Sequence, residues 1–268
     1  MKVIIQVSDK YQHIMPVFCE LFNKYWSNQE CVIICFTPPL TKLPDNFEIF
    51  EIGEDLGWPA NFEYFCKSFK DEFFILHLDD HILTEYVNMD KLKIMEGEMI
   101  KGADKAMLHS HLNLYSTPTQ GDILTINQNA PYRTSIHTAM WRTEYLMKNI
   151  RDNETIGSFE THHGSLNDGA KIVSMQSSNR YYDNIVEFMN LYRNGKVDKS
   201  ITGLWHEEDL DILLKIPMSE DNRKELIRTS NNKCPMCSFN VDRMLLKERN
   251  HVKYYETHGI CYTCQTKS

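Results

Sequence analysis

Short apolar runs alternate with amphipathic stretches along the first part of the chain. The runs VIIQV (3–7) and VIICF (32–36) are rich in β-branched residues and are bounded by turn-forming residues, which is typical of buried parallel strands. Between them, PVFCELFNKYW (16–26) begins with Pro16 and spaces its apolar residues along one helical face. The pattern therefore predicts a β-α-β unit at the start of the chain.

The alternation continues beyond this unit. A helix is predicted over 59–69, followed by the strand EFFILHL at 72–78. A further helix is predicted over 88–102, with Asn88 as its N-cap and Gly102 as its stop. Residues 104–138 alternate more regularly and are predicted to be strands of a mixed sheet. The predicted fold class is α/β, with a Rossmann-like mixed central sheet.

Composition places this sheet in an ordinary soluble protein. The 268 residues are 42% hydrophobic and 25% charged, which leaves room for one domain of about 200 residues plus an appendage. No apolar run has the length of a membrane span, and the start, MKVIIQVSDKY, is interpreted as a first strand and not as a signal peptide. We therefore expect no membrane span and a cytoplasmic location.

The charge is unevenly distributed along the chain. The net charge is −8, but residues 223–268 hold nine Lys and Arg against four Asp and Glu. That balance of +5 leaves −13 on residues 1–222. The C-terminal tail thus carries a net charge opposite in sign to that of the rest of the chain.

The predicted strand at 72–78 runs into two aspartates and a histidine, in FFILHLDDHIL. Open α/β sheets bind ligands at the carboxyl ends of their parallel strands. If the strand continues, Asp79 and His81 point to one side, with Asp80 opposite. A carboxylate oxygen and an imidazole nitrogen could then share a divalent cation, which could hold a diphosphate. The alternative is a strand end that turns into a solvated acidic loop.

A second histidine motif, HSH at 109–111, would place two histidines on one strand face. Because the sequence fixes no nearby thiol or carboxylate, we interpret them as two histidines on the sheet surface and not as a metal site.

Four cysteines carry the strongest local signal in the chain. CPMC and CYTC are two Cys-x-x-Cys pairs separated by 23 residues, which is close to the spacing of four-thiolate zinc sites. Cys234, Cys237, Cys261 and Cys264 are therefore predicted to bind one structural Zn²⁺ in a zinc-ribbon-like module. A redox role for either pair is the weaker alternative. Cys19, Cys31, Cys35 and Cys66 lie among apolar residues and are predicted to be reduced, buried thiols.

The predicted zinc module is also basic and aromatic. Its positively charged and ring-bearing side chains include Arg243, Lys247, Arg249, His251, Lys253, Tyr254 and Tyr255. Such a surface would offer charge and stacking to a phosphate backbone, which predicts a nucleic-acid partner. The alternative is that the module only supports the main domain or a dimer.

Several segments in order resemble the nucleotide-sugar glycosyltransferases of the GT-A fold, particularly bacterial and phage-type members. The segments are VSDKYQHIMPVFCELFNKYW, GEDLGWPANFEYF, FFILHLDDHIL and SIHTAMWRTEYLMKNIRDNETIGSFE. The resemblance covers roughly residues 1–205. It implies a GT-A domain at 1–205, a helical connector at 206–232 and the zinc-ribbon-like module at 233–268.

The resemblance assigns expected roles to individual residues. It implies that Ser8, Asp9 and Tyr11 hold the nucleoside and that Asp55, Gly57, Trp58 and Asn61 lie beside the donor, together with Asp79, Asp80, Trp141 and Arg142. It implies that Asp79 and His81 hold the catalytic cation, with His162 or His163 completing its shell, and that Glu160 is the base. Since His81 replaces the second aspartate of the usual Asp-any-Asp motif, Mn²⁺ is favoured over Mg²⁺.

Structural alternatives accompany these roles. Ser8 and Asp9 could form a turn with a helix cap, and Trp58 could anchor a turn on the core. Trp141 with Arg142 could be a core tryptophan beside an arginine that caps the sheet edge, while His162 and His163 could lie in a surface loop.

The function implied is metal-dependent transfer of a sugar from a nucleotide-diphosphate sugar, expected to be a UDP-sugar, to a hydroxyl of a macromolecule. A hydroxymethylated base in phage DNA is the favoured acceptor, and the cytoplasm would then be that of a bacterial host. Two alternatives stay open: glycosyl transfer in surface polysaccharide or lipopolysaccharide synthesis, and a non-catalytic zinc-ribbon adaptor that binds a nucleotide. Donor sugar, anomeric outcome and oligomeric state do not follow from the sequence.

Overall fold

The computed structural model describes residues 1–39, 41–55, 57–161, 167–176, 184–193, 196–197 and 207–230. They form two compact units whose segments alternate along the chain. Unit 1 comprises Met1–Gln12, Trp26–Asp79 and Glu85–Glu187, and unit 2 comprises His13–Tyr25, Asp80–Thr84 and the described residues from Phe188 onward. The chain therefore passes between the units five times.

Unit 1 is built on a nine-stranded mixed sheet with the order β3-β2-β1-β4-β9-β6-β10-β8-β7. Its strands are β1 (Val3–Gln6), β2 (Cys31–Cys35), β3 (Phe47–Glu51), β4 (Phe73–Leu78), β6 (Lys105–Met107), β7 (Ser116–Gln120), β8 (Ile123–Ile126), β9 (Ala139–Arg142) and β10 (Ile172–Met175). Strands β1, β2, β3 and β4 pair in parallel, and β9 lies antiparallel between β4 and β6. Strand β6 therefore runs in the same direction as β4, and β10 is parallel to β6. The carboxyl ends of these six strands (β1, β2, β3, β4, β6 and β10) lie on one side of the sheet, called here the carboxyl edge.

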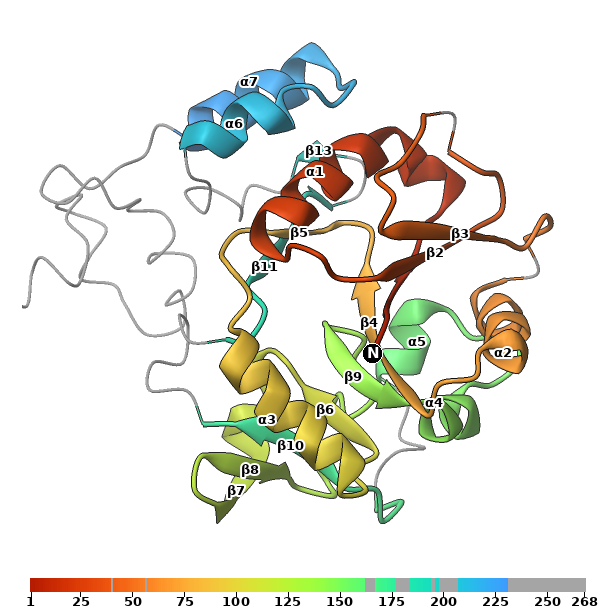
Figure 1. Cartoon of the computed structure of the whole chain (residues 1–268), viewed down its shortest axis with the longest axis vertical. Helices are drawn as coiled ribbons and strands as arrows, with labels where there is room; N and C mark the ends of the chain where they lie inside the picture. The colour runs from red at the N-terminus through yellow and green to blue at the C-terminus, as the bar shows by residue number, and fades with distance from the viewer. Residues whose placement is uncertain are drawn as a thin grey trace, which may run out of the picture. The chain divides into compact units, whose positions relative to one another are not determined.

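The core of unit 1 joins this sheet to three helices, α2 (Trp58–Ser68), α4 (Thr143–Asn149) and α5 (Ile156–Thr161), which lie close together in Figure 1. Phe62, Phe65, Phe74, Trp141 and Phe159 belong to one buried apolar cluster. Burying one large side chain of this kind contributes about 1.5–3 kcal/mol. A further helix, α3 (Met89–Ile100), packs its buried apolar residues against β6, β9 and β10.

Unit 2 centres on α1 (Met15–Tyr25), which follows the 3-10 helix η1 (Asp9–Ile14). Its other elements are β5 (His81–Leu83), β11 (Phe188–Asn190), β12 (Tyr192–Arg193), β13 (Lys196–Val197), α6 (Glu207–Leu213) and α7 (Glu220–Ser230). Strand β5 pairs antiparallel with β11. The fully buried Asp209 of α6 accepts hydrogen bonds from Tyr25 Oη and, at 2.6 Å, from Lys24 Nζ. These two bonds tie α6 to α1.

Most predicted elements before residue 104 are confirmed. The strands at 3–7, 32–36 and 72–78 correspond to β1, β2 and β4, and the helices at 16–26, 59–69 and 88–102 to α1, α2 and α3. Asn88 caps α3, because its side chain accepts a hydrogen bond from Lys91 N at 3.1 Å.

The prediction for 104–138 was wrong in part. Strands β6, β7 and β8 lie there, but Ser110–Tyr115 is a 3-10 helix (η2) and 127–138 contains neither helix nor strand. Strands β3, β9 and β10 were not predicted. The predicted zinc-ribbon-like module at 233–268 lies outside the described residues, and the predicted domain boundaries stay a prediction. Among the described residues, no helix has the length and apolarity required to cross a bilayer.

Candidate functional site

The carboxyl edge of unit 1 brings together polar residues from several strands. Ser8 follows β1 and Asp79 follows β4, and the Ser8 N–H donates to Asp79 Oδ2 at 3.2 Å. Asp79 is only 8% exposed. The parallel pairing of β1 with β4 thus places a largely buried carboxylate where open α/β sheets bind ligands.

A second polar group lies beside the ends of β1 and β2. The exposed carboxylate of Asp9 accepts from Gln12 Nε2 at 2.9 Å and from Thr37 Oγ1 at 3.1 Å. Tyr11 N donates to Ser8 O at 2.8 Å, which closes a turn. The three residues predicted to hold the nucleoside therefore share one turn at the carboxyl edge.

The loop before α2 is fixed by one carboxylate. Asp55 Oδ1 accepts from Gly57 N at 2.8 Å and from the buried Asn61 Nδ2 at 3.0 Å. Gly57 has φ 85° and ψ 155°, a backbone region that is essentially restricted to glycine. Trp58 packs its ring on Phe159 with centroids 4.8 Å apart. Trp58 therefore anchors the loop on the core, next to the helix that carries Glu160.

Glu160 is held by the segment that leads into β9. Its Oε1 accepts from Ile136 N at 2.8 Å and from Ser135 Oγ at 3.1 Å. Because β9 pairs antiparallel with β4, this segment approaches the sheet beside the end of β4, where His77 Nδ1 lies 2.8 Å from Thr138 Oγ1. Glu160 therefore belongs to the same carboxyl edge as Asp79.

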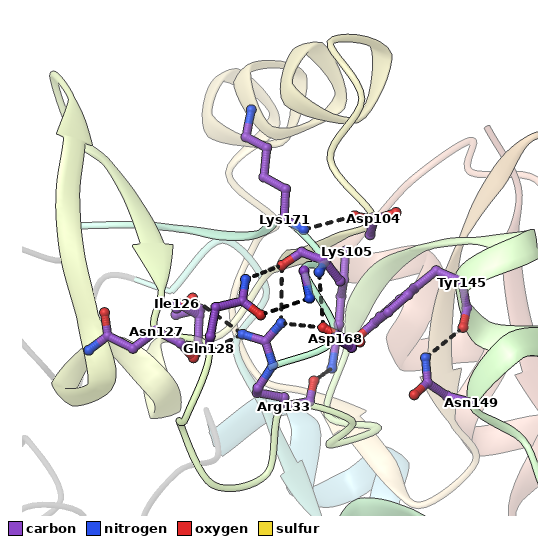
Figure 2. A network of polar contacts seen from close by, with 12 residues as sticks. Asp104, Lys105, Ile126, Asn127, Gln128, Arg133, Tyr145, Asn149, Asp168 and Lys171 are labelled. Atoms are coloured by element: carbon purple, nitrogen blue, oxygen red, sulfur yellow. Dashed lines mark hydrogen bonds and ion pairs between the residues drawn. The ribbon is translucent and has the colours of Figure 1, made fainter. Parts of the chain in front are cut away.

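Two buried basic side chains hold the 127–138 loop in place (Figure 2). Arg133 pairs with Asp168 at 3.1 Å and donates to Asn127 O at 2.9 Å. Lys105 Nζ donates to Arg133 O at 3.0 Å and to Ser135 O at 2.6 Å, and it lies 3.9 Å from the centre of the Trp141 ring. Burial lowers the pKa of Lys105 well below its ordinary value, while the negative charge of Glu160 acts in the opposite direction. Most of these hydrogen bonds are accepted by backbone carbonyl oxygens. The conformation of the loop backbone therefore depends on the side chains of Arg133 and Lys105.

Three histidines meet at the carboxyl edge: His109 after β6, His111 in η2 and His137 before β9. The ring centroids of His111 and His137 are 4.4 Å apart, and those of His109 and His111 are 5.7 Å apart. The prediction of two sheet-surface histidines at 109–111 was wrong, because the chain leaves the sheet after β6 and enters a 3-10 helix. The third member was missed because strand pairing brings His137 in from a distant part of the sequence.

Burial disfavours the charged forms of His111 and His137. Burial lowers the pKa of His111 to about 2, and the neighbouring His137 and His109 add to that effect. Burial also lowers the pKa of His137, against the opposing charge of Glu160. Glu160 is therefore close enough to the histidine cluster to act on it electrostatically.

The strand does not continue through the Asp-Asp-His motif. Strand β4 ends at Leu78 and a turn occupies Asp79 and Asp80, so the condition under which Asp79 and His81 were expected to point to one side is not met. The turn forms because Asp favours turns over strands. Whether Asp79 and His81 share a cation stays a prediction.

Asp79 belongs to unit 1, whereas Asp80 and His81 belong to unit 2. There the His81 ring stacks on Phe188 at 3.9 Å, and Asp80 O accepts from Leu191 N at 2.9 Å. Burial raises the pKa of Asp80 to about 6.

The structure does not bring Trp141 and Arg142 to the carboxyl edge. They pair with Phe74 and Phe73 at the opposite end of β4. Trp141 is fully buried in the core, and Arg142 donates to Ala103 O at 3.0 Å and pairs with Glu72. This arrangement corresponds to the structural alternative of a core tryptophan and an arginine at the sheet edge.

The other predicted ligands lie outside the described residues. They are His162, His163, Cys234, Cys237, Cys261 and Cys264. Their roles in metal binding stay predictions.

No protein-family model matches the chain, and no curated protein is significantly similar to it in sequence. Among solved structures, the chain is similar to the bifunctional IspDF from Campylobacter jejuni, with a TM-score of 0.43 and 13% identity over 76% of this chain. The match spans 54% of IspDF, about half of its length.

Two other solved structures are similar at the same level. For the 2-C-methyl-D-erythritol 4-phosphate cytidylyltransferase from Thermus thermophilus, the TM-score is 0.40 and the identity 10%, over 80% of this chain and 96% of that one. For TarS from S. aureus, the values are 0.41 and 14%, over 87% of this chain and 43% of TarS.

Proposed function

We propose that this chain is a glycosyltransferase that moves a sugar from a nucleotide-diphosphate sugar, a UDP-sugar, to a hydroxyl of a macromolecule. The supporting observation is the convergence of predicted site residues on one edge of the sheet. Asp9 follows β1, Asp55 follows β3 and Asp79 follows β4, while Glu160 is bonded to the segment beside the end of β4. The Trp58–Phe159 contact links the Asp55 loop to the Glu160 helix. The resemblance to GT-A enzymes assigns the donor and the base to this same edge.

In this proposal each group has a separate task. The exposed Asp9 and Tyr11 turn contacts the nucleoside. The backbone at Gly57 and the N-terminus of α2 face the phosphates or the sugar, because a helix N-terminus favours an anion and glycine permits close approach. Asp79 and His81 hold the cation, and Asp79 fits this role as a largely buried oxygen donor. When bound, Mn²⁺ or Mg²⁺ would neutralise the charge that develops on the leaving diphosphate.

Glu160 acts as the base in this proposal. Its carboxylate would take the proton of the acceptor hydroxyl as that oxygen attacks the anomeric carbon, and the nucleotide diphosphate would leave from the opposite side. Its bonds to Ile136 N and Ser135 Oγ fix the carboxylate before the acceptor arrives. Direct displacement of this kind inverts the anomeric centre.

For the acceptor, we propose a hydroxymethylated DNA base, supported by the +5 balance of residues 223–268. A surface glycan and a purely nucleotide-binding adaptor are the outcomes that would replace this proposal. DNA carrying hydroxymethylated bases, unmodified DNA and a polysaccharide, each offered with a labelled UDP-sugar, would separate the acceptors.

The transferase proposal is tested by donor hydrolysis, measured for a panel of nucleotide sugars with Mn²⁺ and with EDTA. Loss of a cation at a developing phosphate charge removes several kcal/mol of stabilisation, so Asp79→Ala and His81→Ala should lower turnover at least about a hundredfold. Glu144→Gln, an exposed carboxylate on α4, is the control and should keep wild-type turnover. Full activity in EDTA would exclude the metal-dependent mechanism, and binding without any turnover would favour the adaptor.

A further inference from the structure

The histidine cluster at the carboxyl edge has no task in the proposed transfer reaction. His109, His111 and His137 each offer one ring nitrogen, and these three atoms lie within 4.8 Å of one another. They come from two chain segments that the pairing of β6 with β9 brings side by side. Three imidazoles at such distances need a physical reason to stay together.

The strongest sign of a missing partner is at His111. Both of its ring nitrogens are buried, and neither makes a hydrogen bond within the part of the chain that the structure describes. A neutral imidazole carries one donor and one acceptor, and each buried polar group left unsatisfied costs about 1–3 kcal/mol. A cation bound to one nitrogen would remove part of this cost.

Both segments of the cluster are held in position by bonds that do not involve the imidazoles. Ser110 N donates to Asn184 Oδ1 at 2.8 Å, which fixes the turn between His109 and His111. Leu108 N donates to Thr138 O at 3.3 Å, which joins that segment to the one with His137. Lys105 Nζ holds the same second segment through Ser135 O. Supporting contacts of this kind orient metal ligands.

We propose that His109, His111 and His137 bind one divalent transition-metal ion of the zinc class. Imidazole nitrogen suits Zn²⁺, Co²⁺, Ni²⁺ and Cu²⁺, whereas Mg²⁺ and Ca²⁺ prefer oxygen. With Zn–N distances of about 2.0–2.1 Å, two nitrogens on a tetrahedral ion lie roughly 3.4 Å apart. Nitrogens that now lie within 4.8 Å of one another would therefore approach by at most about 1.4 Å on binding.

Three protein ligands also leave one coordination position open. In zinc proteins this is the ligand set of sites that bind a water or a substrate oxygen in the fourth position. Here Ser135 Oγ donates to Glu160 Oε1 and accepts a hydrogen bond from the backbone N–H of His137, which links the cluster to Glu160. The three histidines include neither Asp79 nor His81, so this inference does not depend on the transferase proposal.

Metal content tests this site without any activity measurement. The full chain and its His111→Gln variant are equilibrated with Zn²⁺, freed of excess metal and analysed for zinc per chain. The variant should hold one equivalent less than the wild type, and this difference is unaffected by zinc on the C-terminal cysteines. His13→Gln, which changes an exposed histidine outside the cluster, is the matched control and should lose nothing.

Ligand type is then read from the Co²⁺-loaded proteins. The difference spectrum between wild type and His111→Gln should contain visible d–d bands without the near-ultraviolet thiolate charge-transfer band of a cysteine site. If His111→Gln fails to fold, cadmium NMR of the wild type alone decides, with a resonance in the nitrogen-ligand region expected. Equal zinc content in wild type and variant, or cadmium resonances from thiolate sites alone, would overturn the proposal.

Discussion

Glu160 is positioned by two donors of one short segment, Ser135 and Ile136, so its role can be tested with a change that keeps its shape. Glu160→Gln still accepts these hydrogen bonds but cannot take a proton. We expect turnover to fall by about two to four orders of magnitude while donor binding stays near the wild-type value. Steady-state transfer and calorimetric titration with the donor would measure the two quantities.

The control for Glu160→Gln is again Glu144→Gln, which removes an exposed carboxylate elsewhere on unit 1. If Glu160→Gln turned over donor and acceptor at a near-normal rate, the base would have to be another group. If donor affinity fell together with turnover, the carboxylate would act in binding.

Glu98 gives a prediction for the dependence of stability on pH. Its carboxylate accepts from Lys101 Nζ at 2.8 Å and from Lys171 Nζ at 3.1 Å, and the Lys101 hydrogen bond is the first cause of its lowered pKa. A lowered pKa in the folded state adds stability above the ordinary value of 4.5, and this stability is lost as the pH falls through the folded-state pKa.

Glu98→Gln should therefore lower the free energy of unfolding by about 1 kcal/mol at pH 7, the size expected for two partly exposed ion pairs. Urea unfolding across pH 3–7 would measure it, and the gap between wild type and variant should narrow toward pH 3. Lys171→Met should show a smaller gap with the same trend. If the difference in the free energy of unfolding between wild type and variant were constant over pH 3–7, the charge of Glu98 would not contribute to stability.

At the residue scale, site residues could be predicted where a polar motif follows the end of a predicted strand. Asp79 and Glu160 were expected at one site, and both lie at the carboxyl edge. His111 was misassigned, since a His-x-His pair gives no sign of the third histidine that strand pairing adds. Trp141 could not be placed either, because one aromatic residue beside an arginine suits a core as well as a ligand site.

At the scale of elements, the loop at 127–138 depends on Arg133 and its buried ion pair with Asp168. Arg133→Met removes the cation and leaves the Asp168 carboxylate buried with no counter-charge at this position. Breaking a buried pair from one side costs about 3–5 kcal/mol, so we expect a loss of about 3 kcal/mol or more in the free energy of unfolding. Denaturant unfolding would measure it.

Arg151→Met, an exposed arginine, is the control for Arg133→Met and should change stability by less than about 0.5 kcal/mol. Since the loop also carries His137, zinc affinity should fall in Arg133→Met as well. A stability loss below about 1 kcal/mol would mean that the loop is held by other contacts.

Elements with a single strong periodicity could be predicted, and the others could not. The buried β1 and β2 and the amphipathic α1 have patterns that few other structures satisfy. Strand β3 was missed because it lies at the end of the sheet order, and three of its five residues are exposed. The 127–138 loop was taken for strands because its order comes from side-chain bonds to backbone carbonyls, which leave no periodic pattern in the sequence.

At the scale of the whole molecule, residues 1–222 are acidic and residues 223–268 are basic. This difference predicts that the basic tail binds DNA while the rest of the chain binds and hydrolyses the donor. If the acceptor is DNA, reversing Arg243, Lys247 and Arg249 to Glu should weaken DNA binding. The slope of log affinity against log salt should fall by about 0.9 for each lost phosphate contact. Donor hydrolysis should persist in the same variant. Fluorescence anisotropy over a salt series would measure the slope.

Lys93→Glu, an exposed lysine on α3, is the control for the tail charges and should bind DNA as the wild type does. A tail variant that binds and modifies DNA normally would remove the argument for a nucleic acid, leaving a glycan as the better acceptor. If deletion of residues 233–268 damaged hydrolysis as much as transfer, the tail would be a structural support.

The alternation of the two units along the chain has a consequence during translation. Helix α1 is synthesised early, but its bonds from Lys24 and Tyr25 to Asp209 form only after Asp209 has been added, with a sequence separation of 184 residues from Tyr25. At about 5–20 residues per second, the nascent chain carries α1 without this partner for roughly 10–40 s.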